Sequence, residues 1–303
     1  MLTIDQCKIL DISDQELINQ YLLKTNYPGS RNNFLNLYMY QDWTVVVYTV
    51  IDDILLLFYL LDDGIYSLKP LCDKKDLIIA YSYVDEIFEN SNLPKLYTTY
   101  DEELADYLAS TRENLIKKAY REYGDYLYDL EKFKTFSGKK LQKKRNHLNA
   151  FYKLYDYQFV EITNQNVELV KAFLKTWHSD DTDDFIEQEI IANNRALDSI
   201  EELDVYSGCI IIDNKVQGFI IGSRQGANTL QINIEKANDS YRGIYQALLK
   251  ELVIKHGEDF TYLNREEDMG IETLRKSKLA YHPCKILLSY RICAEELHEL
   301  LNW

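Results

Sequence analysis

The chain has 303 residues, which at about 100–200 residues per domain indicates two domains with enough length to bury a core. Hydrophobic residues make up 46% and aromatic residues 13%, which excludes a disordered protein. The formal charge of −15 argues against a protein that coats nucleic acid or anionic membrane non-specifically, and it leaves room for a local basic site. None of the five cysteines shows C-x-x-C spacing, so we expect reduced thiols in a cytoplasmic protein, with no disulfide framework and no zinc knuckle.

The first half of the sequence alternates helix and strand signals. Ser13 and Glu16 form a capping-box pattern that predicts a helix running to about Thr25. Two β-rich runs, 45–51 and 54–61, flank a two-residue acidic turn and predict a hairpin. The acidic turn also interrupts the most hydrophobic window, so no membrane span is predicted there. Further helices are expected near 34–40, 74–90 and 101–118, and strands near 65–69, 95–99 and 125–130.

The second half shows a sharper pattern. Ser137 is expected to cap a helix that runs to about Tyr155. A hairpin is expected to turn at Asp213-Asn214. The other expected elements are a strand at 157–162, helices at 164–178 and 183–201, the strand LQINIEKA, the helix YRGIYQALLKELVIKHG, the strand FTYLNRE, the helix GIETLRKSK and the strand KILLSYRI. Each half thus shows helices, a hairpin and then helix–strand alternation, which predicts two related α/β units that join near residues 124–137.

A basic run interrupts this acidic sequence. Between Lys132 and Tyr155 there are eight basic residues and no acidic residue. Several of them fall on one face of the predicted helix, where concentrated donors suit phosphate groups. The alternative is a basic helix face that pairs with the protein's own carboxylates. The candidate phosphate-binding residues are Lys139, Lys140, Lys143, Lys144, Arg145 and His147.

The turn between LQINIEKA and the following helix is a second candidate. A short Tyr-Arg-Gly turn there presents backbone N–H groups at a helix N-terminus, where a pyrophosphate or a negatively charged intermediate could be held. Junctions of this kind are also common as purely structural turns. The candidate cofactor-binding residues are Tyr241, Arg242, Gly243, Ile244 and Asn264.

Three carboxylates near strand ends suit acid–base chemistry. Acyl transfer to an amine needs a base, and Glu235, Glu266 and Asp268 follow or close strands that are expected to border a cleft. Each of them could instead bind the amino group of a substrate. For Glu266 and Asp268, which precede GIETLRKSK, the structural alternative is a favourable interaction with the dipole of that helix. If strand alternation turns Ile232 and Ile234 inward, it places Gln231, Asn233 and Glu235 together on the opposite face.

Two further features concern a proton donor and a metal. Tyr281 follows the last predicted helix and could donate a proton to a leaving group, although in a chain with 25 tyrosines simple packing is the alternative. His178 precedes Asp180 and Asp181, but no second histidine lies at ligand spacing, so no metal site is expected. No nucleophile elbow, P-loop or Cys-His nucleophile pattern is present.

The order hairpin, strand, Arg-Gly turn, helix, strand, helix, strand is that of the GNAT acyltransferase core. More specifically, SGKKLQKKRNHLNAF, IEKAN, YRGIYQALL and LNREEDMGIETLRKSKLAYHP resemble the phosphatidylglycerol lysyltransferase C-terminal domain family. The resemblance covers essentially the whole chain. It implies an α/β (α+β) fold of two tandem GNAT-like units related to Fem-type aminoacyl transferases, with mixed sheets flanked by helices. We expect a degenerate first unit at residues 1–130 and a second at 131–303.

The resemblance also bears on the acyl donor. GNAT coenzyme A loops resemble R-x-x-G-x-G or G-x-G-x-A, whereas the run from Arg242 to Ala247 has one glycine and a bulky tyrosine. Such a shortened loop is more similar to Fem-type enzymes, which use aminoacyl-tRNA. We therefore expect a soluble, cytoplasmic acyltransferase that moves an aminoacyl group from tRNA to an amine or hydroxyl of a small molecule or peptide by direct attack, without a tightly bound cofactor. The alternatives are an acetyl-CoA-dependent N-acetyltransferase and a non-catalytic phosphate- or RNA-binding module.

Overall fold

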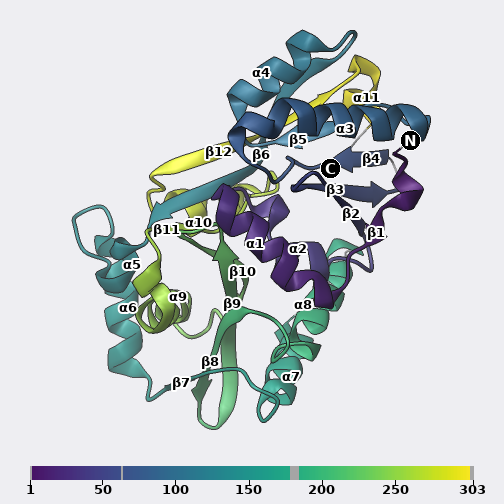
Figure 1. The fold of residues 1–303 in the computed structure, drawn as a ribbon. Helices are drawn as coiled ribbons and strands as arrows, with labels where there is room; N and C mark the ends of the chain where they lie inside the picture. Colours follow the sequence, from purple (N-terminus) through teal and green to yellow (C-terminus); the bar gives the residue numbers. More distant parts are fainter. Residues whose placement is uncertain (1, 63, 178–183, 301–303) are drawn as a thin grey trace.

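One mixed sheet of twelve strands runs through the described part of the chain, with helices packed on both of its faces (Figure 1). The computed structural model describes residues 2–62, 64–177 and 184–300. The strand order is β1-β2-β3-β4-β5-β12-β6-β11-β10-β9-β8-β7. This is the α/β fold with a mixed sheet that the sequence predicts.

The first half contributes six strands and four α-helices. The strands are β1 (Lys8–Ile9), β2 (Val45–Ile51), β3 (Ile54–Leu61), β4 (Gly64–Ser67), β5 (Tyr97–Thr99) and β6 (Ile116–Asp129). The helices are α1 (Gln15–Thr25), α2 (Phe34–Met39), α3 (Leu77–Asn90) and α4 (Glu102–Thr111). Short 3-10 helices lie at Ile4–Gln6, Ile12–Asp14, Ser30–Asn32 and Lys74–Asp76.

The second half contributes the other strands and helices. The strands are β7 (Gln158–Val160), β8 (Val205–Ile212), β9 (Lys215–Gln225), β10 (Thr229–Ala237), β11 (Tyr262–Asn264) and β12 (Lys285–Cys293). The helices are α5 (Glu131–Thr135), α6 (Gln142–Leu154), α7 (Val167–Trp177), α8 (Asp184–Asp198), α9 (Ile244–His256), α10 (Glu272–Leu279) and α11 (Glu295–Leu300). A 3-10 helix lies at Gly257–Asp259.

Both predicted hairpins are confirmed, and their turns show why. Asp52 and Asp53 have φ angles of 50° and 61°, and Asp213 and Asn214 have φ angles of 51° and 59°. Two-residue hairpin turns with positive φ at both positions match the twist of the strands, and Asp and Asn tolerate that conformation best after glycine. The turn residues therefore set the register of β2 with β3 and of β8 with β9.

Three local predictions are wrong. Ser13 caps no helix: Asp11 caps the 3-10 helix Ile12–Asp14 by accepting from the Ser13 amide, and α1 follows with Asp14 as its N-cap residue. The helix predicted to start at Ser137 begins only at Gln142, because the chain first forms α5 and then turns. The helix predicted over 101–118 ends at Thr111, and its last residues instead begin the long strand β6.

The two halves exchange their last strands. β6, from the first half, lies between β11 and β12 of the second half, while β12 lies between β5 and β6. Leu127 of β6 pairs with both Asn264 of β11 and Lys285 of β12. The predicted domain boundary between residues 130 and 131 therefore falls between β6 and α5. Dividing the chain there would separate strands that are hydrogen-bonded neighbours in one sheet.

Separate apolar clusters form on the two faces of the second-half strands. Along β9, Phe219 and Ile221 join a cluster with α1, α2, α7 and α8, whereas Ile220 joins the opposite cluster with α6 and α9. This alternation is the period-two pattern of a strand buried on both faces. The two clusters place α9 on one side of the central strands and the first-half helices α1 and α2 on the other.

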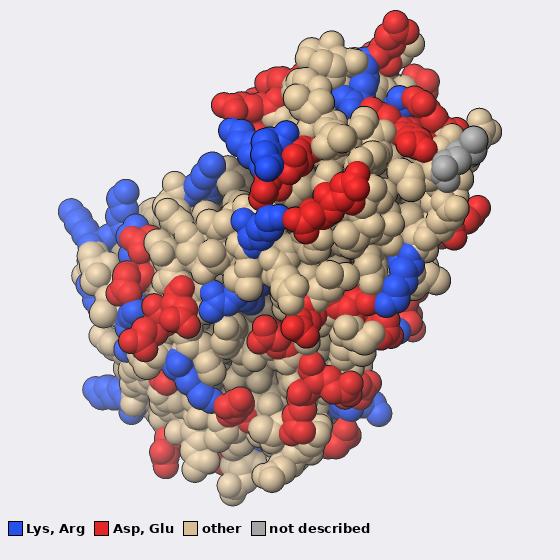
Figure 2. Space-filling view, viewed as in Figure 1, with Lys and Arg blue, Asp and Glu red and all other residues tan. Residues whose placement is uncertain are grey.

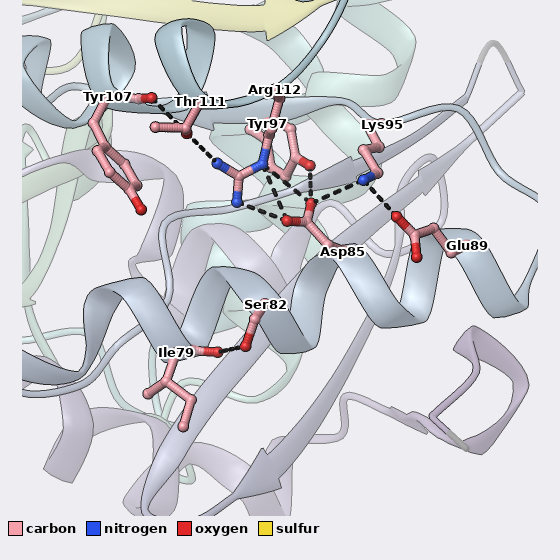
Figure 3. Close-up of polar contacts among 9 residues, drawn as sticks. All are labelled: Ile79, Ser82, Asp85, Glu89, Lys95, Tyr97, Tyr107, Thr111 and Arg112. Atoms are coloured by element: carbon pink, nitrogen blue, oxygen red, sulfur yellow. Dashed lines mark hydrogen bonds and ion pairs between the residues drawn. The ribbon is translucent and has the colours of Figure 1, made fainter.

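A polar cluster fixes α3 and the end of α4 to β5, which lies between β4 and β12 in the sheet (Figure 3). Asp85 of α3 accepts hydrogen bonds from Arg112, whose Nη2 lies 2.7 Å from Oδ2, and from the Tyr97 hydroxyl of β5. Lys95 lies between Asp85 and Glu89. Because Arg112 and Asp85 are only 11% and 21% exposed, the pair is shielded from water and ties three elements together.

Candidate functional site

The centre of the candidate site is the place where β10 and β11 separate. Their parallel pairing runs from Thr229 with Tyr262 to Gln231 with Asn264 and then stops. β10 continues to Ala237, and its register against β9 shifts between Ile232 and Ile234. Such a β-bulge bends a strand and redirects its side chains, and bulges are frequent beside active sites.

The bulge overturns the predicted alternation along β10. Gln231 and Asn233 face the first half, where Asn233 donates to Asn36 at 2.8 Å. Glu235, beyond the bulge, instead accepts from Arg265 on the α9 side of the sheet. The three polar side chains expected on one face are therefore divided between two faces.

Glu235 and Arg265 form an ion pair across the gap between β10 and β11. Arg265 Nη2 donates to Glu235 Oε2 at 2.6 Å, and the side chains are only 11% and 10% exposed. Three buried atoms of the pair have no hydrogen-bond partner among the described residues, namely Glu235 Oε1 and Arg265 Nε and Nη1. Buried polar atoms are normally satisfied, so these free positions indicate a bound ligand or ordered water.

Tyr281 lies beside this pair, together with Lys144 from α6. The Tyr281 ring is 2% exposed and has the Arg265 guanidinium 4.7 Å and the Lys144 ammonium 3.9 Å from its centroid. Its hydroxyl accepts from Gln246 Nε2 of α9 at 2.6 Å, and burial raises its pKa. Burial and the neighbouring Arg265 lower the pKa of Lys144 to about 8. The structure thus brings together three predicted residues, Glu235, Tyr281 and Lys144, with Arg265 and Gln246, which the sequence analysis did not select.

The turn before α9 is closely packed. Gly243 has a φ of 91° and is buried against the backbone of His147 in α6. Ile244 is also buried, the Tyr241 ring packs 5.0 Å from that of Tyr155, and the Arg242 side chain is exposed. Close helix packing is therefore sufficient to explain why glycine occupies position 243. Phosphate binding by the turn stays a prediction.

The predicted basic cluster is divided between surface and interior. Lys139, Lys140 and Lys143 are exposed and form no ion pair with a described residue. Arg145 donates to two backbone carbonyls after α5, at 2.6 and 3.1 Å, so it fixes the loop. His147 is half-buried, and burial lowers its pKa. Figure 2 shows blue side chains projecting at the left edge, over the loop between α5 and α6.

A second polar region lies on the opposite face, where the first half meets β6 and β11. We call Asp125, Glu266 and Glu267 the acidic seam. Glu266 Oε1 accepts from Asn36 Nδ2 at 2.8 Å and from Gln231 Nε2 at 2.7 Å. Asp125 is fully buried and accepts from the Ser30 amide at 2.7 Å and from Asn264 Nδ2 at 2.9 Å. Asn264, a predicted cofactor-binding residue, thus connects the two halves. These hydrogen bonds do not join it to the start of α9, where the other predicted cofactor-binding residues lie.

The acidic seam is electrostatically unusual. Burial, and secondly the neighbouring Glu267, raise the pKa of Glu266 to about 8 and that of Asp125 to about 6. Glu266 also has a φ of 55°, in the left-handed region that glutamate rarely adopts. Shifted pKa values and backbone strain are both common at functional sites. The partner Asn36 lies 230 residues from Glu266, and no local signal in the sequence connects them.

Asp268, the third predicted carboxylate, is fully engaged in structural contacts. It is completely buried and accepts from Arg121, Tyr126, Arg275 and the Gly270 amide. Burial alone would raise its pKa, but the hydrogen bonds from Arg275 and Tyr126 more than offset this and hold the pKa well below its usual range. We therefore expect Asp268 to fix the loop before α10 and to take no part in proton transfer.

A groove of 690 Å³ opens near the end of β10. It is lined by α7, by the turn between β8 and β9 and by residues including Trp177, Ala237 and Tyr245. Trp177 Nε1 and the Tyr245 hydroxyl both donate to the Ala237 carbonyl, at 2.8 and 3.2 Å. The volume suits a small organic ligand. Within residues 2–62, 64–177 and 184–300 no cluster of three metal-ligating side chains occurs, and His178, Asp180 and Asp181 lie outside the described residues.

The strand order, in which β10 and β11 separate beyond Gln231 and Asn264, is that of a tandem GNAT-like fold. A solved structure of a conserved protein of unknown function from Bacteroides thetaiotaomicron is 28% identical and matches 96% of this chain and 99% of its own, with a TM-score of 0.89. The C-terminal domain of a putative lysylphosphatidylglycerol synthetase from Agrobacterium fabrum is 12% identical and matches 95% of this chain and 93% of its own, with a TM-score of 0.67.

The family model "phosphatidylglycerol lysyltransferase, C-terminal" matches residues 24–293, and the chain belongs to this family. The predicted family is therefore confirmed. An uncharacterized protein of Mycoplasmoides gallisepticum is 34% identical over 171 residues, and this match spans 55% of either protein, about half of the relative's length. Across the described residues, every helix is too short or too polar to cross a membrane.

Proposed function

We propose that the protein transfers an aminoacyl group from aminoacyl-tRNA to an amine or hydroxyl acceptor. The observation that carries this proposal is the set of free atoms on the Glu235–Arg265 pair. No described residue donates to one carboxylate oxygen of the pair, and none accepts from two of the guanidinium nitrogens, Nε and Nη1. An aminoacyl ester carries an ammonium group next to its carbonyl oxygen, so it supplies the missing donor and the missing acceptor together.

The same contacts suit the reaction. With the α-ammonium on Glu235, the carbonyl oxygen lies toward Arg265, whose N–H groups stabilise the negative charge that develops there during attack. Tyr281 accepts a hydrogen bond from Gln246, so its own proton is available for the ribose oxygen that leaves. The acceptor attacks the carbonyl directly. An acetyl group has no ammonium and would leave Glu235 Oε1 unmatched, which argues against acetyl-CoA as the donor.

The basic run that includes the start of α6 extends from this site to the surface of the protein. Lys144 reaches the Tyr281 ring, while Lys140 and Lys143 of the same basic run are exposed. Exposed lysines of this kind bind phosphates through charge, independently of sequence. We therefore place the acceptor stem of the tRNA along α6, with its aminoacyl end directed at Glu235.

A transfer assay with two donors tests this proposal. Labelled aminoacyl-tRNA is offered with a panel of amines and alcohols, and the same tRNA with its α-amine acetylated is the second donor. The wild-type protein should prefer the free α-amine by about tenfold or more, and Glu235→Gln should lose most of this preference together with at least tenfold in rate. The matched control is Glu168→Gln, on an exposed side chain of α7.

Two results would contradict the proposal. One is a Glu235→Gln variant that transfers as fast as the wild type and still prefers the free α-amine. The other is transfer from acetyl-CoA by a protein that ignores every aminoacyl-tRNA.

A further inference from the structure

The acidic seam has unmet hydrogen-bonding capacity in a buried setting. Gln231 is completely buried, and its Nε2 donates to Glu266 while its Oε1 has no partner among the described residues. Glu266 uses Oε1 for both of its hydrogen bonds, and its Oε2 takes part in none that the described residues supply. Gln231 Oε1 and Glu266 Oε2 are thus the two acceptor oxygens next to the Gln231–Glu266 hydrogen bond that accept from no described residue.

Charge at this place favours a cation. Glu267 adjoins Glu266, and its carboxylate forms no ion pair with a described residue. Both glutamates keep part of their surface accessible to water. Burial combined with negative charge raises the cost of ionising Glu266, and a bound cation would offset that cost. A primary ammonium group, with one positive charge and three donors, matches these acceptors.

The seam and the Glu235–Arg265 pair lie on opposite sides of the gap between β10 and β11. Arg265 and Glu266 are consecutive, yet Arg265 contacts Tyr281 on the α9 side and Glu266 contacts Asn36 on the first-half side. Gln231 is the last residue of β10 that pairs with β11, so the seam borders the gap. A group held at the seam thus approaches the gap from the side opposite the donor.

We propose that Glu266 and the Oε1 atom of Gln231 bind the ammonium group of the acceptor, so that this protein acylates a primary amine and forms an amide. This inference rests on the proposed function. Glu266 first takes a proton from the ammonium, and the free amine attacks the ester carbonyl. The C–N bond forms as the C–O bond to the ribose breaks. The amine nitrogen loses a second proton, the ribose oxygen gains one, and the products are an amide, free tRNA and one net proton.

Direct binding of a simple amine tests the seam without any donor. n-Butylamine is titrated into the full chain by calorimetry, with n-butanol as the neutral probe of equal length. We expect butylamine to bind with release of a proton below pH 8 and butanol not to bind measurably. Glu266→Gln should weaken butylamine binding at least tenfold. Gln231→Met, which removes the free oxygen and also the amide nitrogen that donates to Glu266, serves as a second variant, and Glu168→Gln is the control.

The affinity for butylamine should rise about 25-fold between pH 6.5 and 8.5, because Glu266 ionises over this range while the amine stays charged. Several charged and titratable groups on the elements packed around Glu266 also influence its ionisation. They are Glu267, Asp125, Lys278, Tyr40 and Tyr59, and Arg31 faces Glu267 and Asp125. Asp125, whose pKa is about 6, ionises mostly below this range.

The outcomes separate the two proposals. If butanol binds as well as butylamine, or if Glu266→Gln and Gln231→Met both bind butylamine like the wild type, the amine site is refuted. Transfer of an aminoacyl group to an alcohol without amine binding would refute the amine site and leave the proposed function standing. Amine binding that both seam variants abolish, in a protein that uses no aminoacyl-tRNA, would support the site and refute the aminoacyl donor.

Discussion

Gly243, at the start of α9, lies directly against the backbone carbonyl of His147 in α6. A Cβ atom on Gly243 would come 2.2 Å from that oxygen. The backbone φ of 91° is also one that residues with a Cβ rarely adopt. This contact holds α6, which carries Lys143 and Lys144, against α9, which carries Gln246.

Replacing Gly243 with alanine should destabilise the protein markedly. The clash is with backbone, which cannot turn away, so we expect a loss of about 2–4 kcal/mol in the free energy of unfolding. Gly138→Ala is the matched control, because Gly138 has nearly the same φ, 89°, but nothing within 4 Å of its Cβ position. Denaturant unfolding of both variants measures the difference, and equal losses would show that only backbone strain matters at Gly243.

Asp268→Asn should reduce stability without abolishing chemistry. Two arginines and Tyr126 surround this buried carboxylate, so losing its charge should cost about 2 kcal/mol or more at pH 7. Because the pKa is lowered in the folded protein, the stabilisation is present above about pH 4 and is lost as the pH falls further. The difference in unfolding free energy from the wild type should therefore be constant from pH 5 to 8 and shrink below pH 4. A transfer rate that collapses in a folded Asp268→Asn protein would instead give Asp268 a chemical role.

Lys144→Met should change how stability depends on pH. Burial lowers the pKa of Lys144 to about 8, so the unfolded chain binds more protons than the folded chain between pH 8 and about 10.5. The stability of the wild type therefore gains a contribution over this range as the pH rises, which the variant lacks. Relative to the wild type, Lys144→Met should become less stable by about 1–3 kcal/mol from pH 7.5 to 10. Parallel curves for the two proteins would mean that Lys144 is solvated like an ordinary lysine.

Reversing two exposed charges on the basic run should weaken tRNA binding in a salt-dependent way. Each lysine that contacts phosphate releases counterions, so Lys140→Glu/Lys143→Glu should reduce the slope of log affinity against log salt by about 1–2. Lys74→Glu/Lys75→Glu, on exposed lysines of a first-half 3-10 helix, changes the net charge equally and should leave the slope almost unchanged. Filter binding at several salt concentrations measures both slopes. Identical slopes for the two variants would show that only net charge matters.

The sequence by itself determined the elements whose signals are local. The acidic pair Asp52-Asp53 between two β-rich runs specifies a hairpin, because both residues accept positive φ and the runs have a strand period. The motif from Asn264 to Pro283 indicated the family, and the family model confirms it. The sequence also indicated a site residue where a reactive side chain closes a predicted strand, as Glu235 does.

Only the tertiary structure decided how these pieces meet. The exchange of β6 and β12 depends on pairing between residues more than 150 positions apart, which leaves no local period. The bulge that turns Glu235 toward Arg265 shows only in the pairing of β10 with β9, so the alternation within β10 could not reveal it. The partnership of Glu266 with Asn36 arises because the first half folds over the gap between β10 and β11. Local sequence specifies φ, ψ and the face of each element, whereas burial and pKa depend on what the rest of the chain brings to that face.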